Sequence, residues 1–396
     1  MRNGTTTDRI AVVGGGIVGC AAALVLERRL PGRVVHVAPD APPDERTTAL
    51  LDDAVQTLAE LGVWEVVAPA AAPLRTMRLL DGSRRLLRAR PLEFASHEIG
   101  LPQFGFNVRN DALVAAMERT PGPERLRTTL VAMRREGASW RLRLGDGAEI
   151  DAAAVVGADG RASTVRDQAG IGVRRWTYPQ TALVTTFAHD LPHAGVSTEW
   201  HTETGPFTQV PLPGAPDAPH RSSLVHVVRP QDAAALEALP TEELSREIAG
   251  RMQYLLGAVR AERRLAGYPL GGLVADRFGH DGVFLVGEAA HVFPPIGAQG
   301  ANLGFRDIAD CAACLARGGS AEAASQAYDG KRRLDVAART GAVDALNRSL
   351  LTSFLPVHAA RVLGTSLVAR SDALRRTMMR WGLTRGTDRQ AAPPSS

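Results

Sequence analysis

The first residues that could do chemistry are three glycines near the start of the chain. Gly14, Gly16 and Gly19 form a Gly-x-Gly-x-x-Gly pattern between an apolar run at residues 10–13 and an alanine- and leucine-rich stretch at residues 20–30. In a strand–turn–helix context, the first glycine permits a tight turn and the second lets the backbone approach a pyrophosphate. The third lets the helix pack closely on the strand. The pattern predicts a dinucleotide site and leaves NAD and FAD open.

The acidic residue expected at the end of the second strand is missing. Such a residue usually holds the adenosine ribose hydroxyls. Here Ala38 follows the apolar run at residues 34–37, and the nearest acid, Asp40, comes two residues later behind Pro39. The adenosine end of the predicted site is therefore weakened, and Asp40 is a candidate substitute.

Two further segments place an acidic residue shortly after an apolar strand. Residues 153–156 lead into Asp159 and Gly160, and residues 282–286 lead into Glu288. A proline-containing loop and a glycine-rich stretch follow Glu288, and a helix is expected to begin in that stretch. The N-terminus of a helix carries partial positive charge, which stabilises an anionic group in front of it.

These three sites, in this order, resemble the flavoprotein aromatic hydroxylases, the superfamily of p-hydroxybenzoate hydroxylase. The similarity covers about residues 9–383. Within this superfamily, the chain resembles the ubiquinone-ring hydroxylase branch. The segments that carry this closer resemblance are residues 46–50, 61–64, 104–107, 170–172, 178–182, 205–207, 211–213 and 332–349. The resemblance implies bound FAD, NAD(P)H as a transient co-substrate, and O2 activated as a C4a-hydroperoxyflavin that hydroxylates an aromatic ring. The implied substrate is an aromatic small molecule, a prenylated phenol of ubiquinone biosynthesis.

The resemblance also implies cofactor-binding positions beyond the glycine pattern. They are Arg46, Arg109, Asp159, Gly160, Glu288, Pro295, Gly300 and Asn302. An acid beside phosphates repels them, so Asp159 is expected to organise its turn or neighbouring arginines. The family normally carries aspartate where this chain has Glu288, and the extra methylene displaces the carboxylate meant for a ribityl hydroxyl. Pro295 is expected to stiffen the wall beside the flavin ring, and the helix from Gly300 to direct its N-terminus at the ring's N1–C2=O edge.

No residue is assigned as a catalytic base, and no metal site is expected. His291 has no evident acid–base partner in the sequence and is interpreted as structural. His201 and Tyr178 lie in the expected substrate region, but no feature of the sequence singles out either one. Cys311 and Cys314 have the spacing of a redox motif, yet they fall inside a predicted helix without further metal ligands, so helix packing is favoured.

The order of these segments predicts an α/β protein with a discontinuous Rossmann-like FAD-binding domain, a β-sheet substrate domain and a helical C-terminus. The FAD-binding domain is expected to comprise residues 8–75, 101–175 and 267–340, and the substrate domain residues 76–100 and 176–266. Residues 341–385 form the expected C-terminal helical region, and residues 1–7 and 386–396 are expected to be disordered. The flavin should lie at the boundary between the two domains.

Composition favours a cytoplasmic protein without nucleic-acid partners. Hydrophobic residues make up 45% of the chain, charged residues 22%, and the net charge is only +4. No apolar run is long enough to span a bilayer, and three cysteines do not make a disulfide framework. Leucines and arginines recur at helical spacing on both sides of Pro356. That pattern fits equally a helical cap on the flavin domain or a surface that contacts the inner face of a membrane or a quinone-synthesis complex.

Two alternative functions stay open at the level of the sequence. A natural-product aromatic hydroxylase would carry the same flavin-binding motifs. A non-catalytic accessory subunit of a quinone-synthesis assembly is favoured by Ala38 and Glu288, because each weakens an expected cofactor contact. An active enzyme is preferred, since the other site motifs are intact.

Overall fold

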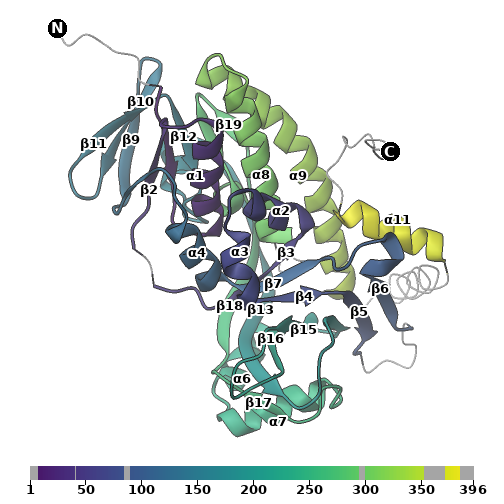
Figure 1. The fold of residues 1–396 in the computed structure, drawn as a ribbon. Helices are drawn as coiled ribbons and strands as arrows, with labels where there is room; N and C mark the ends of the chain where they lie inside the picture. Colours follow the sequence, from purple (N-terminus) through teal and green to yellow (C-terminus); the bar gives the residue numbers. More distant parts are fainter. Residues whose placement is uncertain (1–7, 41, 84–89, 294–298, 352–370, 384–396) are drawn as a thin grey trace.

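A parallel sheet forms around the first predicted strand. The computed structural model describes residues 8–40, 42–83, 90–293, 299–351 and 371–383 (Figure 1). The strand order is β19-β20-β12-β1-β2-β8, with every neighbouring pair parallel except β19 and β20. The bounds are Ile10–Val13 (β1), Val34–Val37 (β2), Glu124–Leu126 (β8), Ala154–Gly157 (β12), Gly279–His280 (β19) and Val283–Leu285 (β20). The central strands are buried along their whole length, as expected for a parallel sheet covered on both faces.

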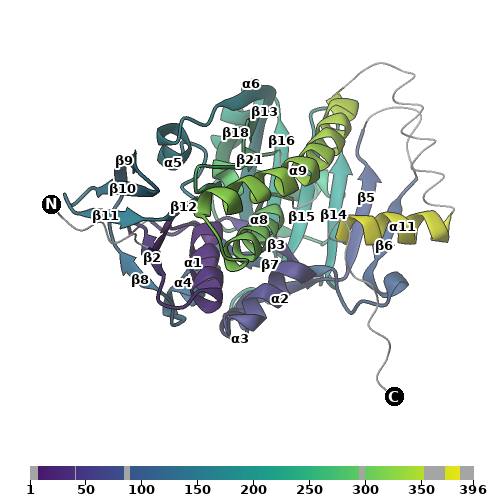
Figure 2. The same cartoon turned by 90° about the horizontal axis from the view of Figure 1, so that it is seen from above.

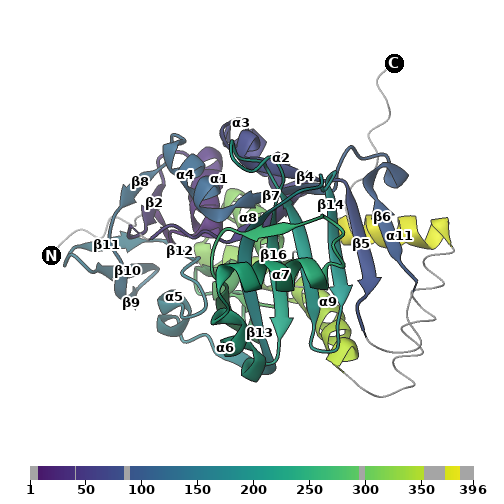
Figure 3. The same cartoon turned by 90° about the horizontal axis from the view of Figure 1, so that it is seen from below.

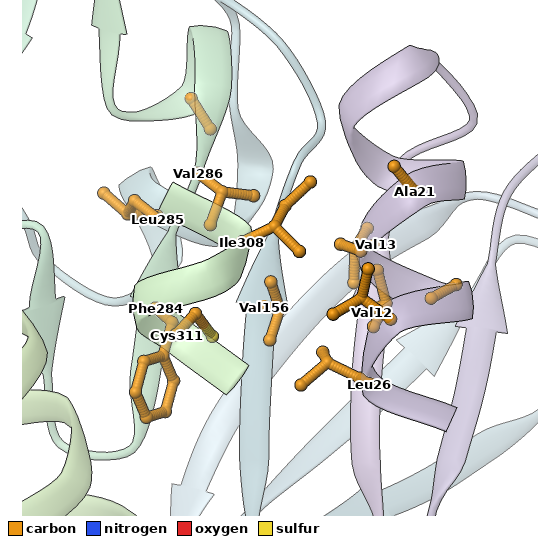
Figure 4. Packing of buried hydrophobic residues seen from close by; sticks show 14 of the residues in the cluster. Val12, Val13, Ala21, Leu26, Val156, Phe284, Leu285, Val286, Ile308 and Cys311 are labelled. Atoms are coloured by element: carbon orange, nitrogen blue, oxygen red, sulfur yellow. The ribbon is translucent and has the colours of Figure 1, made fainter. Parts of the chain in front are cut away.

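Helices from distant parts of the chain pack on this sheet. Their bounds are Ile17–Arg29 (α1), Asn110–Arg119 (α4), Thr164–Gln168 (α5), Gln299–Ala316 (α8) and Ala321–Leu351 (α9). Figure 4 shows the core where α1 and α8 meet the strands, with Leu26 and Ile308 directed toward Val12 and Val156. The small side chains of α1 let it lie close to the sheet, which explains the alanine-rich composition of that stretch.

A second, larger sheet is mostly antiparallel. Its order is β21-β18-β13-β16-β15-β14-β5-β6, with β17 beside β13, and only β5 and β14 run parallel. The bounds are Thr76–Asp81 (β5), Leu92–Ala95 (β6), Val173–His189 (β13), Val196–His201 (β14), Pro206–Leu212 (β15), Arg221–Val228 (β16), Val259–Ala261 (β17), Ala266–Ala275 (β18) and His291–Val292 (β21). Helices Pro230–Glu237 (α6) and Thr241–Arg251 (α7) cover one face and share a hydrophobic core with it (Figure 3).

Two small antiparallel sheets complete the strand structure. One comprises Thr47–Leu51 (β3), Ala71–Leu74 (β4) and Gly105–Arg109 (β7); the other comprises Leu130–Glu136 (β9), Ser139–Leu144 (β10) and Glu149–Ala152 (β11). The first of them contacts the large sheet, because Thr47 Oγ1 lies 3.0 Å from Ser223 Oγ and Asn107 Nδ2 donates to Pro211 O at 2.9 Å. Short helices are Asp52–Glu60 (α2), Trp64–Val67 (α3), Ala68–Ala70 (η1), Ser96–Ile99 (η2) and Gly287–Ala289 (η3).

The predicted α/β class with a helical C-terminus is confirmed. The large sheet takes in β18 and β21 as well as the strands of the expected substrate region, and the division into domains stays a prediction. At the C-terminus, α9 ends at Leu351, and Asp372–Leu383 (α11) lies beside β5 and β6 (Figure 2). Pro356 and the expected disordered ends fall outside the described residues. None of the helices in the described ranges is long and apolar enough to cross a membrane.

Candidate functional site

The glycine turn between β1 and α1 has the close contacts that its pattern predicts. Gly14 has a φ of +131°, and a Cβ there would lie 2.2 Å from Ala158 O. A Cβ at Gly19 would lie 2.1 Å from Gly14 O. Gly16 differs, because among the described residues no atom lies within 4 Å of where its Cβ would be. Packing therefore requires the first and third glycines, while the second leaves space in front of the N-terminus of α1.

That space belongs to a cleft of about 460 Å³. It is lined by the turns that follow three parallel strands, β1, β2 and β12. Its lining includes Gly14, Gly15, Gly16, Pro39, Asp159, Gly160 and Thr164. The carboxyl ends of parallel strands are where open α/β sheets bind ligands, and backbone N–H groups at a helix start bind phosphate. The cleft is therefore suited to a dinucleotide.

Asp159 holds the turn after β12 rather than presenting its charge to the cleft. Its carboxylate accepts hydrogen bonds from Ser163 Oγ at 2.6 Å and from Val165 N at 3.0 Å. The second bond satisfies a backbone donor at the start of α5. This matches the expectation that Asp159 organises its turn. Gly160, next to it, has a φ of +79°, which favours glycine.

The two arginines expected near the cofactor are already ion-paired. Arg46 makes two bonds to Asp44, at 2.8 and 2.7 Å, and its guanidinium lies 5.2 Å from the centre of the Tyr268 ring. Arg109 donates to Asp111 at 3.0 Å. The hydrogen bond that each arginine donates to its carboxylate partner raises the pKa of that arginine. Both arginines flank the β3–β7 sheet, which fixes their backbones.

Glu288 lies in η3 with about half of its side chain exposed. Its Oε2 accepts a bond from Arg161 Nε at 3.2 Å, and both side chains of this pair are accessible, at 53% and 52%. The carboxylate is thus available to a ligand that displaces Arg161. Gly300 is exposed in the first turn of α8. Pro295 lies outside the described residues.

Asn302 fastens α8 to the end of β3. Its Oδ1 accepts from Leu51 N and its Nδ2 donates to Ala49 O, both at 2.8 Å. The side chain is buried. A polar residue expected at the cofactor therefore also sets the position of the helix whose N-terminus was expected to face the flavin. These contacts join residues about 250 positions apart, so they could not be predicted from local sequence patterns.

His291 has a buried partner that the sequence analysis missed. Its Nε2 lies 2.7 Å from Asp307 Oδ2, and the same oxygen accepts from Gly287 N at 2.9 Å. Arg332 of α9 donates to the other oxygen of Asp307 at 2.8 Å. The carboxylate thereby holds the turn that carries Glu288. A buried partner for Asp307 could have been predicted from the sequence. Asp307 lies on the same face of the helix as the apolar Leu303 and Cys311, and a charge on a buried face requires a partner.

Near the expected adenosine end of the cleft, an arginine that the sequence did not single out contacts the backbone that follows β2. Arg125 of β8 donates to Ala38 O at 3.4 Å and to Pro39 O at 3.2 Å. Ala38 itself is fully buried. Asp40 forms an ion pair with Arg127 and keeps 69% of its side chain exposed. Position 38 therefore carries no acid, and the charged groups near it are the paired carboxylate of Asp40 and the guanidinium of Arg125.

Comparison with known proteins decides the family. A model described as FAD binding domain matches residues 7–342 of the chain. The chain belongs to this family. The glycine cradle, the open N-terminus of α1 and the ends of β1, β2 and β12 all fit the pyrophosphate and adenosine of FAD, because each offers backbone donors and none requires a side chain in the cleft. The cofactor predicted from the sequence is thus confirmed as FAD.

Relatives in the FAD-binding family match nearly the whole chain. It is 34% identical to the ubiquinone hydroxylase UbiL of Rhodospirillum rubrum, over 95% of this chain and 90% of the relative. It is 30% identical to the 3-demethoxyubiquinol 3-hydroxylase of Escherichia coli, over 94% of this chain and 98% of the relative. The predicted ubiquinone-ring hydroxylase branch is therefore confirmed, and the chain is an FAD-dependent monooxygenase.

A solved structure confirms the fold of this family. The p-nitrophenol 4-monooxygenase PnpA of Pseudomonas putida DLL-E4 superposes with a TM-score of 0.75, covering 96% of this chain and 99% of that one. Identity is only 19%, so the likeness concerns the fold alone.

Proposed function

We propose that this protein hydroxylates the aromatic ring of a prenylated phenol in ubiquinone biosynthesis, using NAD(P)H and O2. The observation that carries the proposal is the similarity along nearly the whole chain to hydroxylases that are named for ubiquinone and demethoxyubiquinol. The position of the candidate site supports it. Arg46 precedes β3, Arg109 ends β7, and Asn302 joins α8 to β3. Thr47 of β3 in turn contacts Ser223 of the large sheet, where a ring substrate would be enclosed.

The residues of the chain hold and shield the cofactor in this proposal. The turn at Gly14–Gly19 binds the pyrophosphate, and Glu288 binds a ribityl hydroxyl after it leaves Arg161. The N-terminus of α8 faces the flavin ring and stabilises negative charge on it. Bound FAD supplies the electron transfer from NAD(P)H and the C4a carbon at which oxygen is activated. The large sheet excludes water from the flavin ring, so that the electrons taken from NAD(P)H are used to hydroxylate the phenol.

The first experiment is a visible spectrum of the purified protein, with the flavin quantified per chain before and after FAD is added. One FAD per chain is expected. NAD(P)H consumption should then rise with a prenylated phenol, and the product should carry one additional oxygen from O2 by mass spectrometry. A loaded enzyme that consumes NAD(P)H but returns every prenylated phenol unchanged would exclude this substrate class.

The two alternatives give different results in the same experiment. A natural-product hydroxylase would hydroxylate unprenylated aromatic rings in preference to prenylated phenols. A colourless protein that cannot be reconstituted with FAD would favour the accessory subunit, since Glu288 and Ala38 would then have removed cofactor binding.

We also propose that the C-terminal helices bring the enzyme to a membrane surface, where a prenylated substrate resides. On α11, Leu374 and Met378 are 42% and 45% exposed, four residues apart, and the exposed Arg376 lies between them in the sequence. Apolar and cationic side chains on one helix favour anionic lipid. Co-sedimentation with vesicles containing phosphatidylglycerol should exceed that with neutral vesicles, and Leu374→Ser/Met378→Ser should reduce it. Equal sedimentation with both vesicle types would contradict the proposal.

A further inference from the structure

Strand β14 places two titratable side chains on the face of the large sheet opposite to α6 and α7. Side chains alternate along a strand, and Thr198 and Trp200 are buried, with Trp200 in the core under α7. Glu199 and His201 therefore lie on the other face. Each keeps 18% of its side chain exposed, so both are accessible but largely sheltered.

That face is the one turned toward the flavin-binding part of the molecule. Glu199 is in register with Thr208 of β15, which is in register with Val225 of β16. Ser223, two residues before Val225, shares this face and contacts Thr47 of β3. Strand β3 is in turn bonded to Asn302 in α8. The two titratable residues thus share a surface with the residues that contact the cofactor-binding elements.

An apolar patch lies beside them on the same surface. Ala182, Val227 and Leu270 form a small buried cluster, against which Val225 and Tyr178 pack. Neighbouring strands are about 4.8 Å apart, so Val225 stands two strands, or roughly 10 Å, from Glu199. An aromatic ring with a phenolic hydroxyl spans such a separation, with its ring on the patch and its hydroxyl near β14.

The pair has the geometry of an oriented acid–base group. Nε2 of His201 lies 2.7 Å from Oε1 of Glu199, and Thr208 Oγ1 donates to the other carboxylate oxygen at 3.3 Å. A carboxylate at this distance fixes the proton on Nε2 and leaves the Nδ1 lone pair to accept another. Asp81, in register with His201 on β5, adds further negative charge beside it.

We propose that His201, oriented by Glu199, is the general base that ionises the phenol substrate. This inference rests on the proposed function and names a residue for the step that the sequence left unassigned. The proton passes from the phenol oxygen to Nδ1 of His201, and the bonding pair stays on the oxygen as a phenolate. The positively charged imidazolium is stabilised by Glu199. Ionisation makes the ring more electron-rich, which favours its attack on an electrophilic oxygen.

The test uses the FAD-loaded oxidised enzyme and 2-allyl-4-nitrophenol, a phenol with a short hydrocarbon tail whose ionised form absorbs visible light. Difference spectra measure the ionised fraction of the bound probe without turnover. The ionised fraction of the probe bound to the wild type is expected to be at least about threefold that of the free probe in solution at the same pH. His201→Gln should abolish that excess, and Glu199→Gln should reduce it. The exposed His97→Gln is the matched control and should behave as the wild type.

The kinetic readout separates a base from a residue that only supports the fold. For His201→Gln with a prenylated phenol, kcat should fall about 100-fold while KM changes little, the range typical of general-base catalysis. Equal probe ionisation in the wild type and in His201→Gln, or no excess ionisation in the wild type, would overturn the assignment. Should His201→Gln fail to fold, unchanged ionisation in Glu199→Gln would overturn it.

The outcomes also distinguish this inference from the proposed function. Excess ionisation that depends on His201, together with no hydroxylation of any prenylated phenol, would retain the base and reject the substrate class. Hydroxylation that proceeds at the wild-type kcat in His201→Gln would retain the function and reject the base.

Discussion

At the scale of single residues, two glycines of one motif serve different needs. Gly14 is required by the backbone, because its φ is positive and a Cβ would collide with Ala158 O. We propose that Gly16 is required by a ligand instead, because the space around it is open among the described residues. Substitution can therefore separate folding from cofactor binding.

We predict that Gly16→Val leaves the apoprotein's free energy of unfolding within about 1 kcal/mol of wild type but weakens FAD binding at least about tenfold. Gly14→Ala should instead cost about 3 kcal/mol or more, since the strain lies in the folded backbone. Urea denaturation and fluorescence titration with FAD measure the two effects. Normal FAD affinity in Gly16→Val would remove Gly16 from the binding site.

His226 is the residue whose burial bears most directly on pH. It is 3% exposed, its Nε2 has no hydrogen-bond partner within the described ranges, and it lies edge-on to Phe207. Burial, assisted by the charge of Arg251, lowers the pKa of His226 from 6.5 to about 3. Because the folded-state pKa lies below the unfolded value, its contribution to stability is complete above pH 6.5. That contribution is lost as the pH falls toward 3.

We therefore expect His226→Leu to lose less stability than the wild type between pH 7 and pH 5. The difference should be about 2 kcal/mol, from 1.36 kcal/mol per pH unit below 6.5. Urea denaturation at both pH values measures it, with His97→Leu as the control at an exposed position. An unchanged loss in His226→Leu would show that His226 is protonated in the folded state.

At the scale of elements, α8 is positioned by polar side chains as well as by its apolar face. Asn302 bonds its first turns to β3, and Asp307 bonds its middle to η3, to His291 and to α9 through Arg332. Asp307 and Arg332 are almost completely buried, at 0% and 2%. A buried charge without its partner is costly, so the pair acts as one unit.

We predict that Asp307→Asn lowers the free energy of unfolding by about 3–5 kcal/mol, because Arg332 is left buried without its main counter-charge. The double variant Asp307→Asn/Arg332→Met should recover part of this loss. Chemical denaturation of the wild type, Asp307→Asn, Arg332→Met and the double variant gives the coupling energy between the two side chains. If the two side chains are not coupled, the double variant will lose the sum of the stabilities that the two single variants lose.

At the scale of the whole molecule, α11 makes few buried contacts with the rest of the described residues. Arg375 donates to Glu98 of η2 at 2.7 Å and to Asp372 at 2.9 Å, while Met379 is buried. Much of the remaining surface of α11 is exposed. Elements held by few buried contacts open locally at low free energy.

We expect Glu98→Ala to increase amide hydrogen exchange in residues 372–379 by about threefold to tenfold, with the parallel sheet unaffected. The reason is that α11 loses an ion pair in which both side chains are only 16% exposed. The control is Glu93→Ala on β6, which removes the exposed ion-pair partner of Arg78 on β5. Equal exchange in both variants would mean that apolar contacts alone hold α11.

The sequence by itself determined the parallel sheet, the glycine turn and the family. The first strand and the glycine turn depend on local spacing, because a strand, three glycines and a helix within 20 residues leave few alternatives. The family rested on the resemblance of three sites spread along the chain, since the glycine motif alone left NAD and FAD open. The helix near Gly300 and the turn at Asp159 were predictable for the same reason. The sequence also suggested a weak adenosine end, since Ala38 stands where an acid is usual.

The tertiary structure alone decided which polar groups meet. Asn302 reaches β3, Asp307 reaches His291 and Arg332, and Arg125 reaches the carbonyls of residues 38 and 39. Glu199 and His201 are alternate residues of β14, a strand that was not predicted from the sequence. Their face could be assigned only after α6 and α7 were found to cover the other side. The physical reason is that periodicity tells which side chains share a face, whereas packing between distant segments decides what that face meets.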